Sequence, residues 1–334
     1  MSVIVYLKDG LGGEVIMSTS KYTDLTYSYS RAKMLDTCAR SYYFSYYASS
    51  GGWRQDAAQK NKQIYRLKKL QGLNSIVGVA IHTAITGLIV NPNLARIDFK
   101  RRTNQKIRES YRNSMARKDE WIQDPKLFLM IQEIYYCGEV TLETQLKIID
   151  KIDACGEHLG SCRSLNEIRH GADIVTVDEL KDFTYNGCKT YVKVDALYQS
   201  RDTGHFIVVD WKTGKGSEIE VEQLLLYVFF MHKMYDIPVE AIEARLEYLV
   251  DGDCASYRFT SHDMEMAEKI ISSGIRKMQK YLFDKEKNIP MPETYFPQNK
   301  SSKCNYCNYL EVCFGDEIVV SETEAAKVLA GVGC

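Results

Sequence analysis

The chain has 334 residues, of which 45% are hydrophobic and 26% charged, and its formal net charge is −1. This is ordinary globular composition, with only 6 prolines and no low-complexity linker, so it predicts one compact body and excludes a string of separate modules. A net charge near zero also excludes a global positive field, so any surface for nucleic acid must be local.

The N-terminus lacks the basic and then apolar layout of a signal peptide. The most apolar stretches, Ile76–Val90 and Leu224–Met231, are too short or too polar for a membrane span, so we predict a cytoplasmic protein without a membrane partner. Thiols stay reduced in the cytosol. Metal binding is therefore the better explanation for those of the 10 cysteines that cluster.

The first half of the chain is predicted to be mainly helical. A strand or hairpin at the start is followed by a helical pattern from Ser28 and by a basic helix over about Asp56–Leu70. Ser75–Val90 is apolar except for His82 and predicts a buried helix. Residues 91–170 show only helical signals.

The pattern changes to strands at Gly171. Three strands are predicted, joined by turns at Asn186-Gly187 and at 202–204, and a helix from about Ser217 to Tyr235 follows them. A strand pair and a long helix come next. The three predicted strands are Ile174–Val177, Thr190–Leu197 and His205–Trp211, the strand pair is Glu243–Val250 with Ala255–Phe259, and the long helix is Thr260–Lys285. This order predicts an α/β core.

Two predicted strands end in carboxylates. Asp210 and Lys212 point to the same side because side chains alternate along a strand, and Asp195 lies near the end of the preceding strand. Carboxylate oxygens suit Mg²⁺ or Mn²⁺, and a lysine beside them could position a water or offset developing charge. The pattern Asp-x-Lys alone is better explained as a salt bridge at a strand end.

The next helix adds polar groups on one face. Gln223 and Tyr227 are four residues apart, and their helix begins directly after the Asp-x-Lys strand, so this face can be turned toward the carboxylates. A structural hydrogen bond and a core tyrosine would explain the pair equally well. His82, the single imidazole of its apolar helix, is by itself better explained as a core residue.

Three cysteines lie close together near the C-terminus, in the pattern Cys304-x₂-Cys307-x₅-Cys313. Cys38 is the best candidate for a fourth ligand. Four thiolates bind Zn²⁺ or an iron–sulfur cluster. A zinc ribbon usually has two C-x₂-C pairs and this chain has one, which favours a [4Fe–4S] cluster.

Taken together, these motifs resemble the RecB-type branch of the PD-(D/E)XK nuclease superfamily. The resemblance rests on Gly78…His82, Val194-Asp195, Asp210-Trp211-Lys212 and Gln223-x₃-Tyr227, in that order. One N-terminal cysteine with a C-terminal C-x₂-C-x₅-C is similar to its iron–sulfur members, which include CRISPR-associated exonucleases and AddB-type nuclease domains. The similarity extends from Cys38 to Cys313.

The resemblance implies a role for each of these residues. His82, Asp195, Asp210 and the backbone carbonyl of Trp211 would bind Mg²⁺ or Mn²⁺. Lys212 would be the catalytic lysine, and Gln223 and Tyr227 would orient the site or the DNA. The cluster ligands would be Cys38, Cys304, Cys307 and Cys313, and the cluster would clamp the N-terminal helix to the C-terminal tail.

The implied fold is a PD-(D/E)XK core, a mixed central sheet flanked by helices, with a large helical insertion and a terminal lobe clamped by the cluster. We expect residues 1–334 to form a single nuclease domain. Within it, residues 21–90 would be an N-terminal helical part with the first cluster cysteine, 91–170 the insertion, 171–285 the catalytic core and 286–334 the cysteine-rich segment.

The expected function is metal-dependent hydrolysis of DNA, by an exonuclease acting on single-stranded ends. The basic run Lys100, Arg101, Arg102, Lys106 and Arg108 is either a solvated helix face or a DNA contact. Two alternatives remain at this point: a DNA-binding or scaffolding subunit active only with protein partners, and a zinc-stabilised protein of another function. Repair, CRISPR adaptation and antiviral defence are all compatible pathways.

Overall fold

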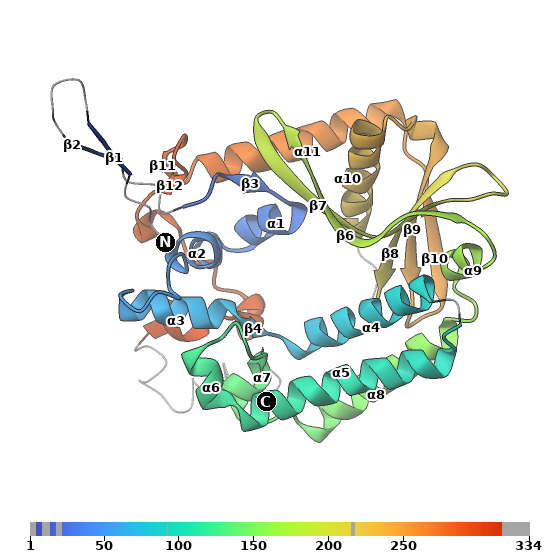
Figure 1. Cartoon of the computed structure of the whole chain (residues 1–334), viewed down its shortest axis with the longest axis horizontal. Coiled ribbons are helices and arrows are strands. Elements are labelled where there is room, and N and C mark those ends of the chain that lie inside the picture. Colours follow the sequence, from blue (N-terminus) through green and yellow to red (C-terminus); the bar gives the residue numbers. More distant parts are fainter. Residues whose placement is uncertain (1–4, 9–13, 18–21, 92, 215–217, 316–334) are drawn as a thin grey trace.

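The structure is a computed structural model that describes residues 5–8, 14–17, 22–91, 93–214 and 218–315 (Figure 1). The predicted helix start Ser217 and residues 316–334 of the cysteine-rich segment lie outside this part of the chain. At the N-terminal end, strand β1 (Val5–Lys8) pairs antiparallel with β2 (Glu14–Met17), which forms the predicted hairpin.

A mixed sheet of six strands forms the centre of the fold. The strand order is β10-β9-β8-β7-β3, and β6 also pairs with β7. The pairs β8–β9 and β3–β7 are parallel, and the others are antiparallel. The strands are β3 (Thr26–Tyr27), β6 (Asp173–Tyr185), β7 (Cys188–Gln199), β8 (Phe206–Lys212), β9 (Ile242–Tyr248) and β10 (Asp253–Tyr257). The predicted α/β class, with a mixed sheet and flanking helices, is confirmed.

The long β6–β7 hairpin is closed by the predicted Asn-Gly turn. Asn186 and Gly187 both have positive φ, 48° and 72°. Two-residue hairpin loops need this left-handed backbone to match the twist of the strands, and asparagine and glycine adopt it at the lowest cost. The turn therefore sets the pairing of β6 with β7, and Asp195 lies within β7, before its end at Gln199.

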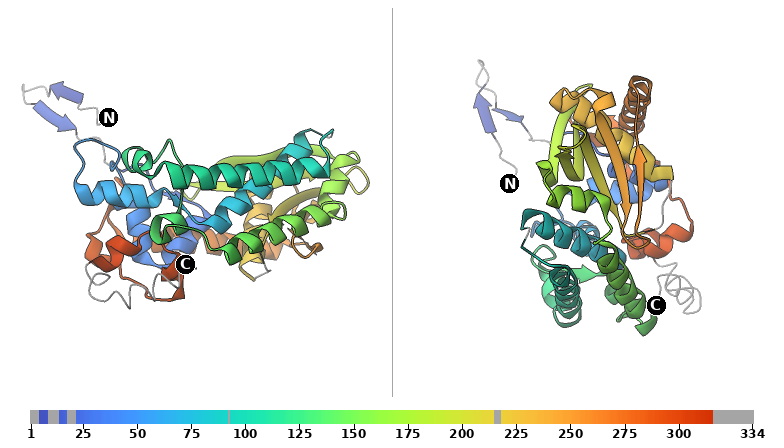
Figure 2. Two further views of the ribbon diagram at one scale, coloured as in Figure 1. Left: turned by 90° about the horizontal axis from the view of Figure 1, so that it is seen from below. Right: turned by 90° about the vertical axis from the view of Figure 1, so that its right-hand side faces the viewer.

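Helices cover both faces of the sheet (Figures 1 and 2). One face packs on α10 (Glu218–Tyr235) and α11 (Ser261–Gln279), and the opposite face packs on α4 (Leu73–Val90) and on helices between residues 96 and 169. Each face of the sheet has its own hydrophobic core, and the side chains of β8 alternate between the two. Val208 belongs to the core under α10 and α11, and Ile207 and Val209 belong to the core under α4. The helices between 96 and 169 are α5 (Arg96–Ala116), α6 (Lys118–Gln123), α7 (Gln132–Cys137), α8 (Leu142–His158) and α9 (Arg163–Arg169).

Helix α4 is longer than its sequence pattern indicated. It begins at Leu73, and its 18 residues are long and apolar enough to cross a membrane by length and composition. The sequence-based judgement that this stretch is too short is therefore wrong as to length. Half of the helix is buried, however, and it packs against α5, α8 and α9. Helix α4 is therefore apolar because it is a core helix that packs against other helices.

Short helices near the N-terminus pack against the C-terminal segment. They are α1 (Tyr29–Thr37), α2 (Ala39–Tyr43), the π-helix Phe44–Ala48 and α3 (Gln59–Lys68). Arg40 donates to the carbonyl oxygen of Phe296 at 2.8 Å and pairs with Glu293 at 3.0 Å. Ser45 and Tyr309 share a buried hydrogen bond of 2.8 Å. These contacts bring Cys38 beside the C-terminal cysteines.

Smaller elements complete the described chain. The predicted helix Thr260–Lys285 is too long, because α11 ends at Gln279 and β11 (Leu282–Asp284) pairs with β12 (Ile289–Pro290). A two-residue strand, β5 (Met130–Ile131), interrupts the expected helical stretch and pairs with β4 (Leu70–Gln71). The last helix is α12 (Leu310–Phe314), and single-turn 3-10 helices cover Val239–Ala241, Glu293–Tyr295 and Ser302–Tyr306.

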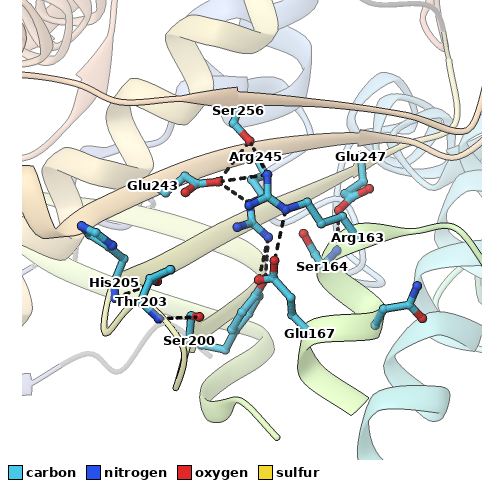
Figure 3. A network of polar contacts seen from close by, with 12 residues as sticks. Arg163, Ser164, Glu167, Ser200, Thr203, His205, Glu243, Arg245, Glu247 and Ser256 are labelled. Atoms are coloured by element: carbon cyan, nitrogen blue, oxygen red, sulfur yellow. Dashed lines mark hydrogen bonds and ion pairs between the residues drawn. The ribbon is translucent and has the colours of Figure 1, made fainter. Parts of the chain in front are cut away.

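A buried ionic network ties α9 to the sheet (Figure 3). Arg245 on β9 is 2% exposed and donates to Glu243 at 2.6 Å, to Glu167 at 2.8 Å and to the hydroxyl of Tyr198 at 2.9 Å. The guanidinium is planar and its donors are fixed, so each partner is held in one place. Asp210 is on the neighbouring strand β8, and its side chain is on the other face of the sheet from this network. The network therefore stiffens the sheet on the face opposite Asp210.

Candidate active site

The site lies where β8 ends. Asp210 is 5% exposed, and on this strand it alternates with the buried residues Val209 and Trp211. Lys212, two residues further on, forms an ion pair with Oδ2 of Asp210. This oxygen is buried, and the contact with Lys212 offsets part of its charge. Asp210 and Lys212 therefore form the salt bridge that the Asp-x-Lys pattern allowed. The salt bridge is buried, and burial raises the free energy of an ionised carboxylate.

Asp195 meets Asp210 from the neighbouring strand. Its Oδ2 accepts a hydrogen bond of 2.8 Å from the backbone N–H of Trp211, which fixes the carboxyl group against β8. Burial and the charge of Asp195 raise the pKa of Asp210 to about 7, although Lys212 acts against both. Two carboxylates this close repel each other, and burial strengthens the repulsion. The pair therefore gains from a cation bound between or beside them.

His82 reaches the carboxylates from α4. Its Nδ1 lies 3.1 Å from Oδ1 of Asp195. Burial opposes a charge on this imidazole, but the hydrogen bond to Asp195 and the charges of both carboxylates outweigh it and raise the pKa of His82. Gly78, one turn earlier, lies beside the turn after β8, and a Cβ atom there would make an ordinary contact of 3.6 Å with Oγ1 of Thr213.

Gln223 and Tyr227 complete the site from α10. Lys212 donates to Oε1 of Gln223 at 3.3 Å, and Nε2 of Gln223 donates to the Tyr227 hydroxyl at 2.5 Å. Burial and the charges of the two aspartates raise the pKa of Tyr227 well above its usual value, so the phenol stays protonated. The helix thus extends one chain of polar contacts from Asp210 through Lys212 and Gln223 to Tyr227.

The predicted site residues are therefore brought together. His82, Asp195, Asp210, Lys212, Gln223 and Tyr227 come from four separate elements and form one connected set of contacts. Within the described ranges, no three histidine, cysteine or carboxylate side chains are grouped closely enough to hold a metal ion. In the structure, Lys212 pairs with the carboxylate of Asp210, and His82 adds a second positive charge beside Asp195 only when its imidazole is protonated.

The four predicted cluster cysteines line one cavity of about 310 Å³. Cys38 lies between α1 and α2, and Cys304, Cys307 and Cys313 come from the C-terminal segment. Burial and the neighbouring thiols Cys38 and Cys304 raise the pKa of Cys307. Burial raises the pKa of Cys313 to about 11, and the thiols of Cys307, Cys38 and Cys304 act in the same direction. Cysteines that are distant in sequence thus share one electrostatic environment.

The basic residues suggested for DNA binding lie on α5. Lys100 is half-buried and pairs with Asp153 of α8 at 2.6 Å, which gives it a structural role between two helices. Arg101 pairs with Asp98 on its own helix. Arg102, Lys106 and Arg108 are exposed. A DNA contact by these residues stays a prediction.

Sequence reasoning missed Tyr29, Lys33 and Glu222, which lie next to the site. The carboxylate of Glu222 neighbours Gln223 on α10 and accepts a hydrogen bond of 2.9 Å from the hydroxyl of Tyr29, 193 positions earlier. Lys33 pairs with the same oxygen at 2.9 Å. Neither α1 residue belongs to a recognisable motif, and only the packing of α1 beside α10 could have revealed them.

Comparison with known proteins agrees with this geometry. No curated protein matches the chain. The model of the PD-(D/E)XK nuclease superfamily matches residues 26–314, which include every site residue described above and all four cysteines. A match over this much of the sequence, together with buried carboxylates and a lysine at the end of a central strand, establishes the family. The chain belongs to the PD-(D/E)XK nuclease superfamily.

Proposed function

We propose that this nuclease hydrolyses DNA with Mg²⁺ or Mn²⁺ and acts as an exonuclease on single-stranded ends. The observation that carries the proposal is the contact chain His82–Asp195–Asp210–Lys212–Gln223, which contains every polar residue type that such hydrolysis needs. A RecB-like subtype follows from the position of His82 on a helix before the sheet. The substrate preference and the polarity are the finer parts of the proposal.

The metal ligands would be His82, Asp195, Asp210 and the backbone carbonyl of Trp211. The residue types fit a hard divalent cation, because Asp195 and Asp210 are adjacent carboxylates in a largely buried place and their repulsion raises the pKa of Asp210. Bound there, the ion would polarise the phosphate and acidify a water. His82 accepts metal through a neutral nitrogen, so its contact with Asp195 would give way to the ion.

The protein's own groups would then orient the reaction. Lys212 is held between Asp210 and Gln223, which places its ammonium group beside the carboxylates. A fixed cation there stabilises negative charge that develops on the phosphate, and little reorganisation is needed because the group is already in position. Tyr227 keeps its proton and fixes the amide of Gln223, so that the amide oxygen faces Lys212.

The cysteine cavity would hold a [4Fe–4S] cluster. Its volume of about 310 Å³ is many times what a single water occupies, and four thiols line it. Four thiolates are the ligand set of such a cluster, and the single C-x₂-C pair of this chain favours it over a zinc ribbon. The cluster would join α1 and α2 to the C-terminal segment, where Arg40 and Ser45 already make contacts.

The test is cleavage of single- and double-stranded DNA labelled at the 5′ or 3′ end, with Mg²⁺ or Mn²⁺. We expect release of short products from single strands and a loss of about 100-fold or more in Lys212→Ala. Lys181→Ala, which removes a lysine on the outer strand β6, is the matched control and should keep full activity. Equal activity of Lys212→Ala and the wild type would refute the site. No cleavage by cluster-loaded wild type would indicate the scaffolding subunit instead.

A further inference from the structure

A groove of about 640 Å³ opens beside the catalytic residues, and nothing in the proposed chemistry uses it. Its walls come from the start of α1, from β6 and β7, and from α10. We call it the Tyr29 groove and define it by Tyr29, Lys33, Phe183, Tyr191, Lys193 and Gln223. Gln223 and Tyr227 line the groove and also belong to the site. The groove is therefore continuous with the catalytic centre.

The lining combines aromatic side chains with cations. Tyr29 and Tyr191 are half-buried, so part of each ring is open to a ligand. Lys33 and Lys193 lie on the same groove with side chains 37% and 53% exposed, and they pair at its surface with Glu222 at 2.9 Å and with Asp178 at 2.6 Å. Aromatic rings receive the flat faces of nucleobases, and lysines neutralise phosphates. An apolar groove without the lysines would suit a lipid or a protein segment equally well.

Glu222 holds the aromatic wall in place. Its Oε2 accepts the hydroxyl hydrogen of Tyr29 and pairs with Lys33, both at 2.9 Å. The ammonium group of Lys33 also lies 5.1 Å from the centre of the Tyr29 ring. Three side chains thus fix one another, so the Tyr29 ring is already oriented before a ligand arrives. Such preorganisation lowers the entropy cost of binding.

We propose that the Tyr29 groove binds unpaired nucleobases of the strand whose phosphate reaches Lys212, and that Tyr29 and Tyr191 set the preference for single strands. The inference rests on the proposed nuclease function. In a duplex the bases are stacked and paired, so their faces are not available to the two rings. A space of this volume is in the range of about 300–1,000 Å³ that holds small organic ligands, which suits one or two nucleotides.

Binding can be measured without cleavage in the Lys212→Ala background of the full chain. Fluorescence anisotropy would compare a labelled 12-nucleotide oligothymidylate, an abasic strand of the same length and a 12-base-pair duplex. We expect the oligothymidylate to bind about ten-fold more tightly than the abasic strand, because the phosphates are the same and only stacking differs. Equal affinity for the two strands would overturn the proposal.

Variants locate the effect in the groove. Tyr191→Ala should lose most of the ten-fold difference, and Tyr29→Phe should keep most of it because the ring remains. The matched control is Tyr295→Ala, which removes a tyrosine that is 62% exposed and lies outside the groove. Leu180→Glu, at a groove position that is 59% exposed, should fold normally and weaken binding of the oligothymidylate several-fold. If Tyr191→Ala and Leu180→Glu both bind like the background protein, the groove is not the binding site.

The groove and the nuclease function can fail separately. If wild type cuts DNA but binds abasic and normal strands alike, the function stands and the groove proposal is wrong. If wild type does not cut but Tyr191→Ala removes the preference for bases, the groove stands and the nuclease proposal is wrong.

Discussion

Asp210→Asn is expected to abolish cleavage and, in the absence of metal, to stabilise the fold. The carboxyl group of Asp210 is 5% exposed and adjacent to Asp195. An asparagine of nearly the same shape cannot ionise, so it removes the repulsion between the two carboxylates without leaving a cavity. Loss of activity with a gain in stability would mark Asp210 as a residue retained for function rather than for folding.

The size of the gain follows from the pKa. Asp210 has a pKa of about 7 in the folded protein against an ordinary 3.8, a rise of about 3 units at about 1.4 kcal/mol each. The folded state keeps a proton that the unfolded chain releases, so the free energy of unfolding falls as pH rises from about 4 to about 7. At about pH 8 the full cost, on the order of 4 kcal/mol, is present. The attraction of Lys212 already lowers this pKa and is therefore contained in the figure, so the expected net gain is on the order of 4 kcal/mol.

Thermal unfolding at about pH 8 in EDTA measures this gain. At about 2–4 °C per kcal/mol, Asp210→Asn should melt on the order of 10 °C above wild type, and at about pH 4 the difference should vanish. Added Mn²⁺ should raise the melting temperature of wild type more than that of the variant. Glu243→Gln is the control, and its melting temperature should fall. Burial raises the pKa of Glu243, but Arg245 outweighs burial and lowers it. Breaking this buried ion pair should therefore destabilise the folded protein. Melting of metal-free Asp210→Asn below wild type would refute the reasoning.

Three further predictions concern single side chains. Tyr227→Phe removes the hydroxyl that accepts the Gln223 hydrogen bond, so end-label assays should show cleavage about ten-fold slower, with normal melting. Cys307→Ser removes one of four thiols around the cavity, so metal analysis should show loss of iron, and the melting temperature should fall. Gly187→Ala places a side chain at φ +72°, so urea unfolding should show a loss of about 1 kcal/mol. An unchanged cleavage rate would contradict the prediction for Tyr227→Phe. An unchanged iron content would contradict that for Cys307→Ser, and an unchanged urea midpoint that for Gly187→Ala.

Much of the site could be predicted from the sequence because its parts follow local rules. Alternation along a strand places Asp210 and Lys212 on one side, and the four-residue spacing places Gln223 and Tyr227 on one helix face. The contact between His82 and Asp195, 113 positions apart, has no local signal and came from the family resemblance. The Tyr29 groove was missed because α1, β7 and α10 each contribute a few residues that form no motif.

The buried network around Arg245 could not be recognised from the sequence. Glu243, Arg245 and Glu247 alternate with Ala244 and Leu246, a pattern that is also typical of a strand with one side in solvent. That side is buried instead, because α9 covers it and Glu167 on α9 pairs with Arg245. The charged side chains of the neighbouring strands β9 and β8 are therefore balanced differently. On β9, Arg245 pairs with Glu243 and with Glu167 of α9, whereas on β8 the pairing with Lys212 does not offset burial and the charge of Asp195, so the pKa of Asp210 stays raised. This excess of negative charge is the condition that favours binding of a cation.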